Sequence, residues 1–494
     1  MTKNWTEAAA QAQLPTQLFI DGEFRPARSG KTFANHSPID GRLLGNVAEG
    51  ASEDVDMAVT SGIRAFEDGT WRWMDPAERK KVLLRLADLI RAHNEEIALA
   101  ETLDVGKPIG DTLSVDGLSA ADCFQWYAEA IDKFYGEVAP TSAERIALIT
   151  REPLGVIGAV VPWNYPTIIA SWKIAPALAA GNCVVLKPAE QSPSSALILA
   201  RLAVEAGVPP GVFNVVTGGP AAGEALGRDP RVAKIAFTGS GPVGRKFLQY
   251  AGESNGKQVA VEAGGKSPQI ILDDVPNLDA AVSAVAWGIF YNAGQTCHAG
   301  SRVLVGRGVH DEFLERLVKF TAENFIPGDP LSTETKLGAI VSPEQADQVM
   351  NYISIGTESN AELVLGGQRA RTDSGGTYVN PTVFTNVETS SQIAQEEIFG
   401  PVLTVTPVND LADGIRQANG TDYGLAASIW TGDVTAAHSA AQRLRAGTVW
   451  VNTYDEASLM TPFGGFNGSG FGRDRSLHAL SSYTGLKTTW ISLS

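Results

Sequence analysis

Cysteine and histidine are scarce in this chain, which contains three cysteines and six histidines among its 494 residues. Cys123, Cys183 and Cys297 are too few and too far apart for a disulfide framework, and no Cys-x-x-Cys pair suggests a zinc site. A His-Glu-x-x-His motif is also lacking. These absences argue against a disulfide-rich secreted protein and a zinc hydrolase, and we expect no metal site.

Basic charge and long apolar runs are lacking as well. The chain has 39 Lys and Arg against 55 Asp and Glu, a net charge of -16, which disfavours binding to nucleic acids or anionic membranes. The longest apolar runs are shorter than a membrane span, and residues 1–14 lack the apolar segment of a secretory signal. We therefore expect a cytoplasmic protein of two or three domains whose partner is a small molecule.

The order of apolar segments predicts an α/β fold. Residues 19–24 read as a hairpin, and residues 53–66, 76–103 and 116–134 read as helices. Short apolar strands then alternate with helices; the expected strands are 156–161, 183–186, 213–216 and 234–237, followed by 269–272, 302–305, 402–405, 426–430 and 448–451. Such alternation indicates two parallel sheets built from βαβ units, with a cleft between them as the place for a ligand.

Two segments, residues 137–151 and 484–493, fit neither sheet. The second alternates polar and apolar residues in the manner of an edge strand, which needs a partner. We therefore predict that both segments take part in subunit contacts, in a homodimer or a homotetramer.

Cys297 is the first candidate catalytic residue. It lies in a glycine-flanked turn, Gly294 to Gly300, between an expected helix and an expected strand. A thiol on such a turn can meet a substrate, whereas a structural cysteine is usually enclosed in apolar packing. A nucleophilic thiol also requires a base and a donor for the oxyanion.

A glycine-rich turn is the first candidate cofactor site. Gly239, Gly241 and Gly244 match Gly-x-Gly-x-x-Gly between a strand and a helix expected over residues 245–250, so the helix N-terminus could bind a pyrophosphate. A plain strand-to-helix turn is the alternative. Either of two carboxylates could bind the ribose: Glu262, at the usual spacing of ~20 residues, or Glu190 at the end of the strand that ends near Lys187.

Two other polar residues allow a catalytic and an ordinary interpretation. Asn164 follows a strand between two prolines, where its amide could stabilise an oxyanion or simply form an Asx turn. Glu262 lies in an apolar strand before a pair of glycines, where burial could raise its pKa and make it a base. A solvated carboxylate at the strand end is the other interpretation, and these residues alone leave both questions open.

Taken together, these motifs resemble the aldehyde dehydrogenase superfamily over nearly the whole chain. They occur in the order of that family, namely Pro162-Trp163-Asn164, Leu186-Lys187-Pro188-Ala189-Glu190, Phe237-Thr238-Gly239-Ser240, Glu262 with Gly264-Gly265-Lys266, Gly294-Gln295-Thr296-Cys297, Glu396-Glu397-Ile398-Phe399-Gly400-Pro401 and Pro462-Phe463-Gly464-Gly465. The chain is most similar to bacterial γ-glutamyl-γ-aminobutyraldehyde and ω-aminoaldehyde dehydrogenases.

The resemblance implies two Rossmann-like α/β domains and a small β extension for oligomerisation. The expected NAD-binding domain comprises residues 1–127 and 149–264, and the catalytic domain residues 265–477. Residues 128–148 and 478–494 would form the oligomerisation segments.

The resemblance also implies a reaction. Cys297 would attack the aldehyde to form a thiohemiacetal, with the oxyanion held by the Asn164 amide and the Cys297 N–H. Hydride transfer to the nicotinamide would leave a thioester, and Glu262 would activate the water that hydrolyses it. This role overrules the ribose interpretation of Glu262, while Lys173 and Asp474 would relay protons.

The cofactor implied by the resemblance is NAD, with NADP as an alternative. Lys187 and Glu190 would bind the adenine ribose, and Glu190 favours NAD because a carboxylate repels the 2′-phosphate of NADP. Ser240 would contact the pyrophosphate, and Glu397 the nicotinamide ribose. The full expected set is Trp163, Lys187, Glu190, Gly239, Ser240, Val243, Gly264, Glu397 and Phe399.

The substrate tunnel implied by the resemblance has an aromatic wall, and a loop at residues 454–460 forms its mouth. An ω-amino or γ-glutamylamino aldehyde is the expected substrate, yet the loop carries Ser458 where those relatives usually have another acidic residue. An aromatic or aliphatic aldehyde therefore stays an alternative. The expected tunnel residues are Tyr165, Ile169, Trp172, Tyr291, Thr296, His298, Asp455 and Phe463.

Two rival functions fit the residues less well. A CoA-acylating semialdehyde dehydrogenase generally lacks the glutamate at the position of Glu262. A binding protein that has kept the fold and lost the activity would have no need to retain Cys297, Glu262, Asn164 and Glu397 together.

Overall fold

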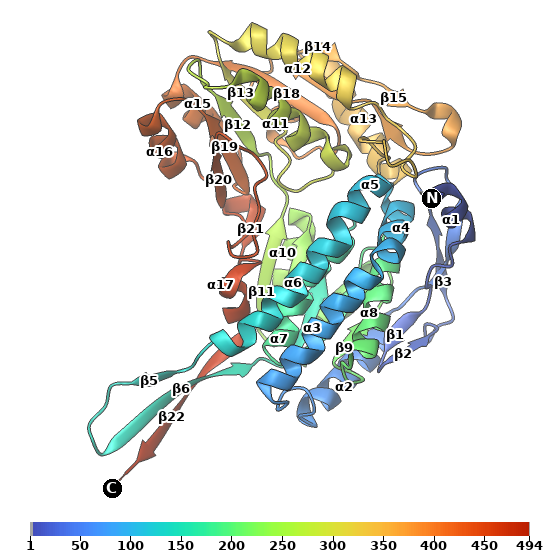
Figure 1. Cartoon of the computed structure of the whole chain (residues 1–494), viewed down its shortest axis with the longest axis vertical. Coiled ribbons are helices and arrows are strands. Elements are labelled where there is room, and N and C mark those ends of the chain that lie inside the picture. Colours follow the sequence, from blue (N-terminus) through green and yellow to red (C-terminus); the bar gives the residue numbers. More distant parts are fainter. Residues whose placement is uncertain (1–2, 494) are drawn as a thin grey trace.

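The computed structural model describes residues 3–493 and contains two large β-sheets, each flanked by helices (Figure 1). The first sheet has eight strands in the order β2-β1-β9-β8-β7-β10-β11-β21. Its five central strands are parallel: β9 (Phe213–Val215), β8 (Cys183–Lys187), β7 (Val156–Val160), β10 (Val232–Gly239) and β11 (Gln258–Ala263). The antiparallel edge strands are β1 (Leu18–Ile20), β2 (Glu23–Arg25) and β21 (Gly470–Phe471).

The strand order of this sheet creates a place for a ligand. The chain runs outward from β7 to β9 and then returns to β10 on the other side of β7. In open α/β sheets, ligands bind at the carboxyl ends of the strands where the order reverses in this way. The helices packed around the sheet are α2 (Ser52–Glu67), α3 (Pro76–Ala92), α4 (Asn94–Val105), α6 (Gly117–Ala130), α7 (Pro166–Ala179), α8 (Ser194–Ala206), α9 (Pro220–Arg228) and α10 (Gly241–Gly252).

The second sheet has seven strands in the order β14-β17-β18-β13-β12-β19-β20. All but the edge strand β14 (Glu362–Leu365) are parallel, namely β17 (Thr382–Thr385), β18 (Val402–Val408), β13 (Arg302–Gly306), β12 (Pro268–Ile271), β19 (Ala426–Trp430) and β20 (Thr448–Val451). Its helices are α11 (Leu278–Phe290), α12 (His310–Asn324), α13 (Pro343–Glu358), α15 (Leu411–Ala418) and α16 (Val434–Arg443). The predicted α/β fold with two Rossmann-like domains is confirmed.

The central strands appear in the sequence as short apolar runs because they are buried. Every residue of β7, β8, β13 and β19 is buried, as expected for strands covered by helices on both faces.

The remaining elements are short: α1 (Trp5–Gln11), β3 (Thr32–His36), β4 (Leu43–Ala48), α5 (Ile109–Asp111), the π-helical turn η1 (Thr112–Asp116), η2 (Ile131–Lys133), η3 (Tyr291–Gly294), β15 (Arg369–Ala370), η4 (Thr372–Ser374), β16 (Tyr378–Val379), α14 (Gln392–Gln395), η5 (Asn467–Ser469) and α17 (Ser476–Ser481).

A third sheet projects from the body of the molecule (Figure 1). It consists of β5 (Glu137–Ala139), β6 (Arg145–Pro153) and the C-terminal β22 (Thr484–Ser492), with β6 in the centre. Strand β22 pairs with β6 in antiparallel register from Thr484 opposite Pro153 to Ser492 opposite Arg145. The strand predicted at the C-terminus is therefore present, and its partner within the chain is β6.

Two local features differ from or refine the sequence prediction. The single helix predicted over residues 76–103 is broken at His93, which is the C-cap residue of α3 and the N-cap residue of α4. Its Nδ1 lies 2.9 Å from the Glu96 carboxylate. The predicted hairpin is present, and Asp21 and Gly22 have φ values of 60° and 82°, as a type I′ turn requires.

The chain crosses between the two large sheets more than once. It leaves the first sheet after β11 and enters the second at β12, yet β21 returns to pair with β11, with Glu262 opposite Gly470. Residues near 470, which we assigned to the catalytic segment, thus complete the edge of the first sheet. None of the described helices is long and apolar enough to cross a membrane.

Candidate active site

Cys297 lies in the turn that connects η3 to β13 and is half-buried. Asn292 and Ala293, in η3, have left-handed φ values of 50° and 53°, which turn the chain sharply ahead of the thiol. Cys123 and Cys183 are fully buried, and burial raises the pKa of each thiol to about 12. Cys297 is therefore the thiol with access to a substrate.

Hydrogen bonds hold this turn against the first domain. The Asn164 side-chain amide, just after β7, donates to the Gln295 carbonyl at 2.9 Å, and the Asn292 amide donates to the Asn164 carbonyl at 3.0 Å. The Gln295 side chain in turn accepts from the Val341 N–H at 2.9 Å. Because an amide nitrogen carries two hydrogens, Asn164 keeps one for a further acceptor beside Cys297.

Glu262 is buried in β11 with 5% of its surface exposed. Among the residues that the structure describes, neither of its carboxylate oxygens has a hydrogen-bond partner. A Cβ at Gly464 would come within 2.3 Å of one of these oxygens, so glycine there makes room for the carboxylate. Burial raises the pKa of Glu262 well above its usual range, Asp474 and Cys297 raise it further, and Lys173 opposes the shift.

Lys173 and Asp474, the predicted proton relay, lie side by side. The Lys173 ammonium donates to the Asp474 carboxylate at 2.5 Å, and both side chains are buried. Their influence on the pKa of Glu262 indicates that all three belong to one electrostatic group.

The candidate phosphate site is the N-terminus of α10. This helix begins at Gly241, four residues before the predicted start, and Ser240 is its N-cap residue without a side-chain capping bond. The first N–H groups of a helix have no partner within it, so they can bind a pyrophosphate. Val243, in the first turn, is exposed, and an uncapped N-terminus of this kind fits a dinucleotide cofactor.

Lys187 and Glu190 lie at the carboxyl end of β8, as the ribose interpretation requires. The Lys187 ammonium donates to the Pro188 carbonyl at 3.0 Å and lies 3.3 Å from the Glu190 carboxylate. Burial lowers the pKa of Lys187, and Glu190 opposes that shift.

Glu397 contacts the segment that links the two large sheets, between β11 and β12. Its carboxylate accepts from the Gly265 N–H at 3.2 Å, and a Cβ at Gly264 would come within 2.0 Å of both its oxygens. Burial raises the pKa of Glu397 to about 7, although the Gly265 N–H and Lys266 oppose the shift. Phe399 has a φ of 57° and packs edge-to-face on Trp163 with ring centroids 5.2 Å apart.

A cavity of about 810 Å³ opens from Cys297. Seven of the eight predicted tunnel residues line it: Tyr165, Ile169, Trp172, Tyr291, His298, Asp455 and Phe463. Thr296 does not line it, which corrects the prediction. Its side chain is buried and its hydroxyl is hydrogen-bonded to the Tyr165 hydroxyl at 2.8 Å, so it supports the wall from behind.

Several residues of the wall were not predicted. Arg475 lies over the rings of Trp172 and Phe463, 5.0 and 4.7 Å from their centroids. The only sequence signal for Trp126 is its place on the helix predicted over residues 116–134, and that pattern does not say which face meets the cavity. The unpredicted lining residues outside the mouth loop are Val115, Ser119, Asp122, Trp126, Ile168, Ala284, Trp287, Gly288, Trp450 and Arg475.

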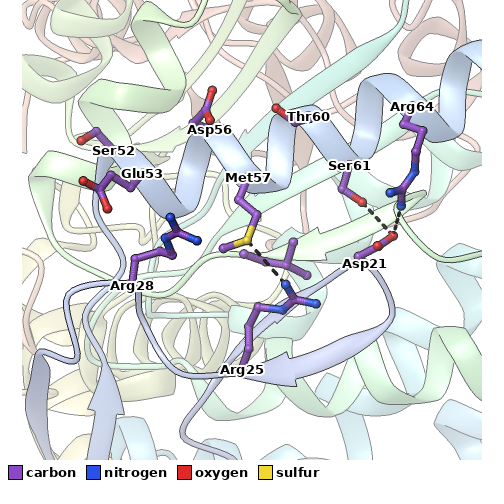
Figure 2. Close-up of a pocket in the computed structure, with 11 residues that line it drawn as sticks. Asp21, Arg25, Arg28, Ser52, Glu53, Asp56, Met57, Thr60, Ser61 and Arg64 are labelled. Carbon is purple, nitrogen blue, oxygen red and sulfur yellow. Dashed lines mark hydrogen bonds and ion pairs between the residues drawn. The ribbon is translucent and has the colours of Figure 1, made fainter.

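A second cavity, of about 630 Å³, lies between the β1–β2 hairpin and α2 (Figure 2). Two of its arginines have partners within the lining: the Arg64 guanidinium donates to Asp21, and Arg25 contacts the Met57 sulfur at 3.5 Å. It contains none of the residues predicted for catalysis or for cofactor binding. The cavity at Cys297 is therefore the candidate active site.

An accessible thiol and a buried carboxylate that senses its charge, contributed by two Rossmann-like domains, fit an aldehyde-oxidising dehydrogenase. The chain belongs to the aldehyde dehydrogenase family, which it matches over residues 24–489.

Several characterised relatives are similar over nearly their full length. The chain is 49% identical over 490 residues to the NADP/NAD-dependent aldehyde dehydrogenase PuuC of Escherichia coli, covering 99% of this chain and 98% of the relative. A solved γ-glutamyl-γ-aminobutyraldehyde dehydrogenase from Burkholderia cenocepacia is 52% identical, with a TM-score of 0.97 and 99% of each chain covered. An indole-3-acetaldehyde dehydrogenase solved with NAD+ is 48% identical, with a TM-score of 0.98 and the same coverage.

These matches confirm the predicted enzyme class and the two-domain fold. They also confirm the predicted nearness to γ-glutamyl-γ-aminobutyraldehyde dehydrogenases. The expectation of a nicotinamide cofactor agrees with the cofactors named for the relatives.

Proposed function

We propose that this chain oxidises an ω-amino or γ-glutamylamino aldehyde to its carboxylic acid with NAD, and that NADP is an alternative cofactor. The observation that carries this proposal is the position of Cys297, a half-buried thiol at the wall of a large cavity, within electrostatic reach of the buried Glu262.

The chemistry follows from the groups around the thiol. The Cys297 thiolate attacks the carbonyl carbon, and the π electrons move to oxygen, where the Asn164 amide and the Cys297 N–H bind the charge; such donors typically contribute ~2.7–4 kcal/mol each. Bound NAD supplies the acceptor for hydride. When the carbonyl re-forms, hydride leaves and the acyl group stays on Cys297 as a thioester.

Hydrolysis of the thioester requires a base. Glu262 takes a proton from a water molecule, the hydroxyl adds to the acyl carbon, and the Cys297 thiolate leaves. Lys173 and Asp474, paired next to Glu262, then carry the proton away. Because its oxygens have no partner in the described part of the chain, Glu262 has no hydrogen bond to break before it binds the water.

Cofactor binding is proposed for the carboxyl edge of the first sheet. The uncapped N-terminus of α10, with Gly239, Ser240 and Val243, would bind the pyrophosphate, and Lys187 with Glu190 the adenine ribose. Trp163, Gly264, Glu397 and Phe399 would surround the nicotinamide ribose and ring. This assignment corresponds to an NAD-binding domain of residues 1–127 and 149–264 and a catalytic domain of residues 265–477.

The cavity wall supports two substrate classes. Asp122, Asp455 and Glu456 line it and could attract an amine, which favours an ω-amino or γ-glutamylamino aldehyde. An aromatic aldehyde is the second candidate, because aromatic side chains make up much of the wall: Trp126, Tyr165, Trp172, Trp287, Tyr291, Trp450, Tyr454 and Phe463.

A panel of aldehydes tests this proposal. We expect kcat/KM to be highest for ω-amino or γ-glutamylamino aldehydes, lower for aromatic and short aliphatic ones, and higher with NAD than with NADP. Cys297→Ala should abolish turnover and leave NAD binding intact, whereas Cys123→Ala, a change at a buried thiol, should retain turnover. Turnover by Cys297→Ala would overturn the proposed chemistry, and a higher kcat/KM for aromatic aldehydes would overturn the substrate assignment alone.

Assembly and location are also proposed here. The projecting sheet carries exposed Val138, Leu486 and Trp490, which favours a homodimer or homotetramer built through residues 128–148 and 478–494. All three cysteines are free, which fits a reducing compartment such as the cytoplasm.

A further inference from the structure

His298, the residue that follows Cys297, lies between the thiol and a carboxylate. Its Nδ1 is 3.7 Å from the Cys297 sulfur, and its Nε2 is 2.6 Å from the Asp455 carboxylate. Only 16% of the His298 side chain is exposed. The sequence suggested His298 and Asp455 solely as parts of the tunnel wall.

The imidazole is held in this position from several sides. Phe463 packs edge-to-face against it with centroids 5.7 Å apart, and Trp450 lies at 6.2 Å. The Tyr454 hydroxyl donates to the His298 carbonyl at 2.5 Å, which ties the turn to the mouth loop. Asp455 itself has a φ of 64°, a conformation that non-glycine residues rarely adopt without support from their surroundings. The contact with the thiol is therefore built into the fold.

We propose that His298 and Asp455 form a dyad that takes the proton of the Cys297 thiol and stabilises the resulting thiolate. Asp455 accepts from the Nε2–H of His298, which leaves Nδ1 of the neutral ring as an acceptor. The proton passes from Sγ to Nδ1 and gives a thiolate beside an imidazolium, with no change in oxidation state. The inference rests on the proposed function, in which Cys297 is the nucleophile.

The charges that face the ring favour the protonated imidazole. Burial alone would lower the pKa of His298, but Asp455 and Cys297 raise it to about 10. Arg475 lies behind Asp455 and contributes to the lowered pKa of that carboxyl. Asp455 stays ionised over the working range, so the imidazolium keeps a counter-ion on one side and the thiolate on the other.

The dyad also separates the two proton transfers of the reaction. His298 Nδ1 lies 3.7 Å from the Cys297 sulfur and offers an acceptor for the thiol proton. With His298 taking that proton, Glu262 is reserved for the water that attacks the thioester. The imidazolium would also stabilise the thiolate when it leaves at the end of the cycle.

Alkylation of Cys297 by iodoacetamide in the intact wild-type enzyme tests the dyad directly. Cys123 and Cys183 are buried, so peptide mass spectrometry can follow the labelling of Cys297 alone. Because the thiolate is the reactive form, we expect wild-type labelling to stay fast below pH 7. In His298→Asn the rate at pH 6.5 should fall about tenfold or more, and the rate above pH 9.5 should stay near that of the wild type.

Two further variants make the result specific. Asp455→Asn should reduce low-pH labelling, because it removes the partner that holds the imidazolium, and His438→Asn, a histidine substitution on α16, should leave the profile unchanged. NAD binding and circular dichroism verify folding. Identical profiles in the wild type and His298→Asn would overturn the dyad. If the dyad is overturned in this way but Cys297→Ala is inactive, the proposed function with Cys297 as the nucleophile still holds.

Discussion

At the scale of single residues, burial decides the chemistry of Glu262. The same carboxylate in water would be ionised and weakly basic, whereas the apolar surroundings and Asp474 raise its pKa and make it a stronger base once ionised. A raised pKa also means that the carboxyl ionises at a higher pH than an ordinary glutamate. The rate of thioester hydrolysis should therefore increase as the pH rises.

Glu262→Gln tests this role. We expect a burst of about one NADH per active site followed by a steady state slowed by roughly 10²–10⁴-fold, because the amide cannot accept the water proton. In the wild type, kcat should rise with pH into the alkaline range, since a raised pKa delays ionisation, and this rise should vanish in the variant. Stopped-flow absorbance at 340 nm measures both phases. An undiminished steady-state rate would remove Glu262 as the base.

The motifs left some assignments open for physical reasons. Spacing made Glu262 a candidate for the ribose, a strand end made Glu190 another, and the family resemblance assigned the ribose to Glu190. In the structure Glu190 follows β8, while Glu262 is inside β11 and buried. The family resemblance assigned Thr296 to the tunnel, but its hydroxyl is hydrogen-bonded to the Tyr165 hydroxyl behind the wall. Contacts of this kind depend on side-chain direction, which spacing does not encode.

At the scale of elements, most periodic strands and helices were predictable from the sequence, whereas the π-helical turn and the break within a long helix were not. The nine predicted strands after residue 155 lie within a few residues of β7, β8, β9, β10, β12, β13, β18, β19 and β20, because such strands are largely buried and so read as short apolar runs. Strands β14 and β17 were not predicted. Helix α13 was missed, although Ser342 caps it and Pro343 starts it, a recognisable start signal. The π-helical turn η1 left no signal, since its shape is set by tertiary contacts.

A buried ion pair links η1 to the active site. The Lys107 ammonium donates to Asp116 at 2.6 Å, and both side chains are completely buried. The same ammonium lies 4.0 Å from the centroid of the Tyr165 ring, which lines the cavity. A change in this pair should therefore affect both stability and substrate binding.

Lys107→Met should destabilise the protein by about 3–5 kcal/mol, because it leaves the Asp116 carboxylate buried without its cation. The double variant Lys107→Met/Asp116→Asn should recover much of that loss, since no charge is then left unpaired. Lys80→Met, which breaks the exposed pair with Asp132, should change stability little. Urea unfolding followed by fluorescence compares the variants. If Lys107→Met unfolds at the wild-type urea concentration, the buried pair does not stabilise the fold.

At the scale of the whole molecule, the site exists only because two domains meet. Cys297 comes from the second domain, while Asn164 and Glu262 come from the first, and the Asn164 amide donates to the Gln295 carbonyl across the junction. The sequence predicted this division because each half has its own strand and helix alternation. It could not predict that β21 returns to the first sheet, since a two-residue strand has no periodicity to read.

The projecting sheet is the feature of the whole molecule that calls for a second subunit. Strand β22 is an edge strand of this sheet and pairs with β6, and its alternation brings Leu486 and Trp490 to one face. These two side chains are 65% and 63% exposed. An exposed apolar strand of this kind is a liability unless another chain covers it.

The double variant Leu486→Asp/Trp490→Asp should therefore dissociate the assembly into monomers, because two carboxylates cannot be buried at a subunit contact without a counter-charge. Sedimentation velocity measures the mass, with the wild type expected as a dimer or a tetramer. Val434→Asp, at a 69% exposed position on α16, controls for added surface charge and should leave the mass unchanged. A monomeric wild type, or a double variant of unchanged mass, would show that this sheet does not join subunits.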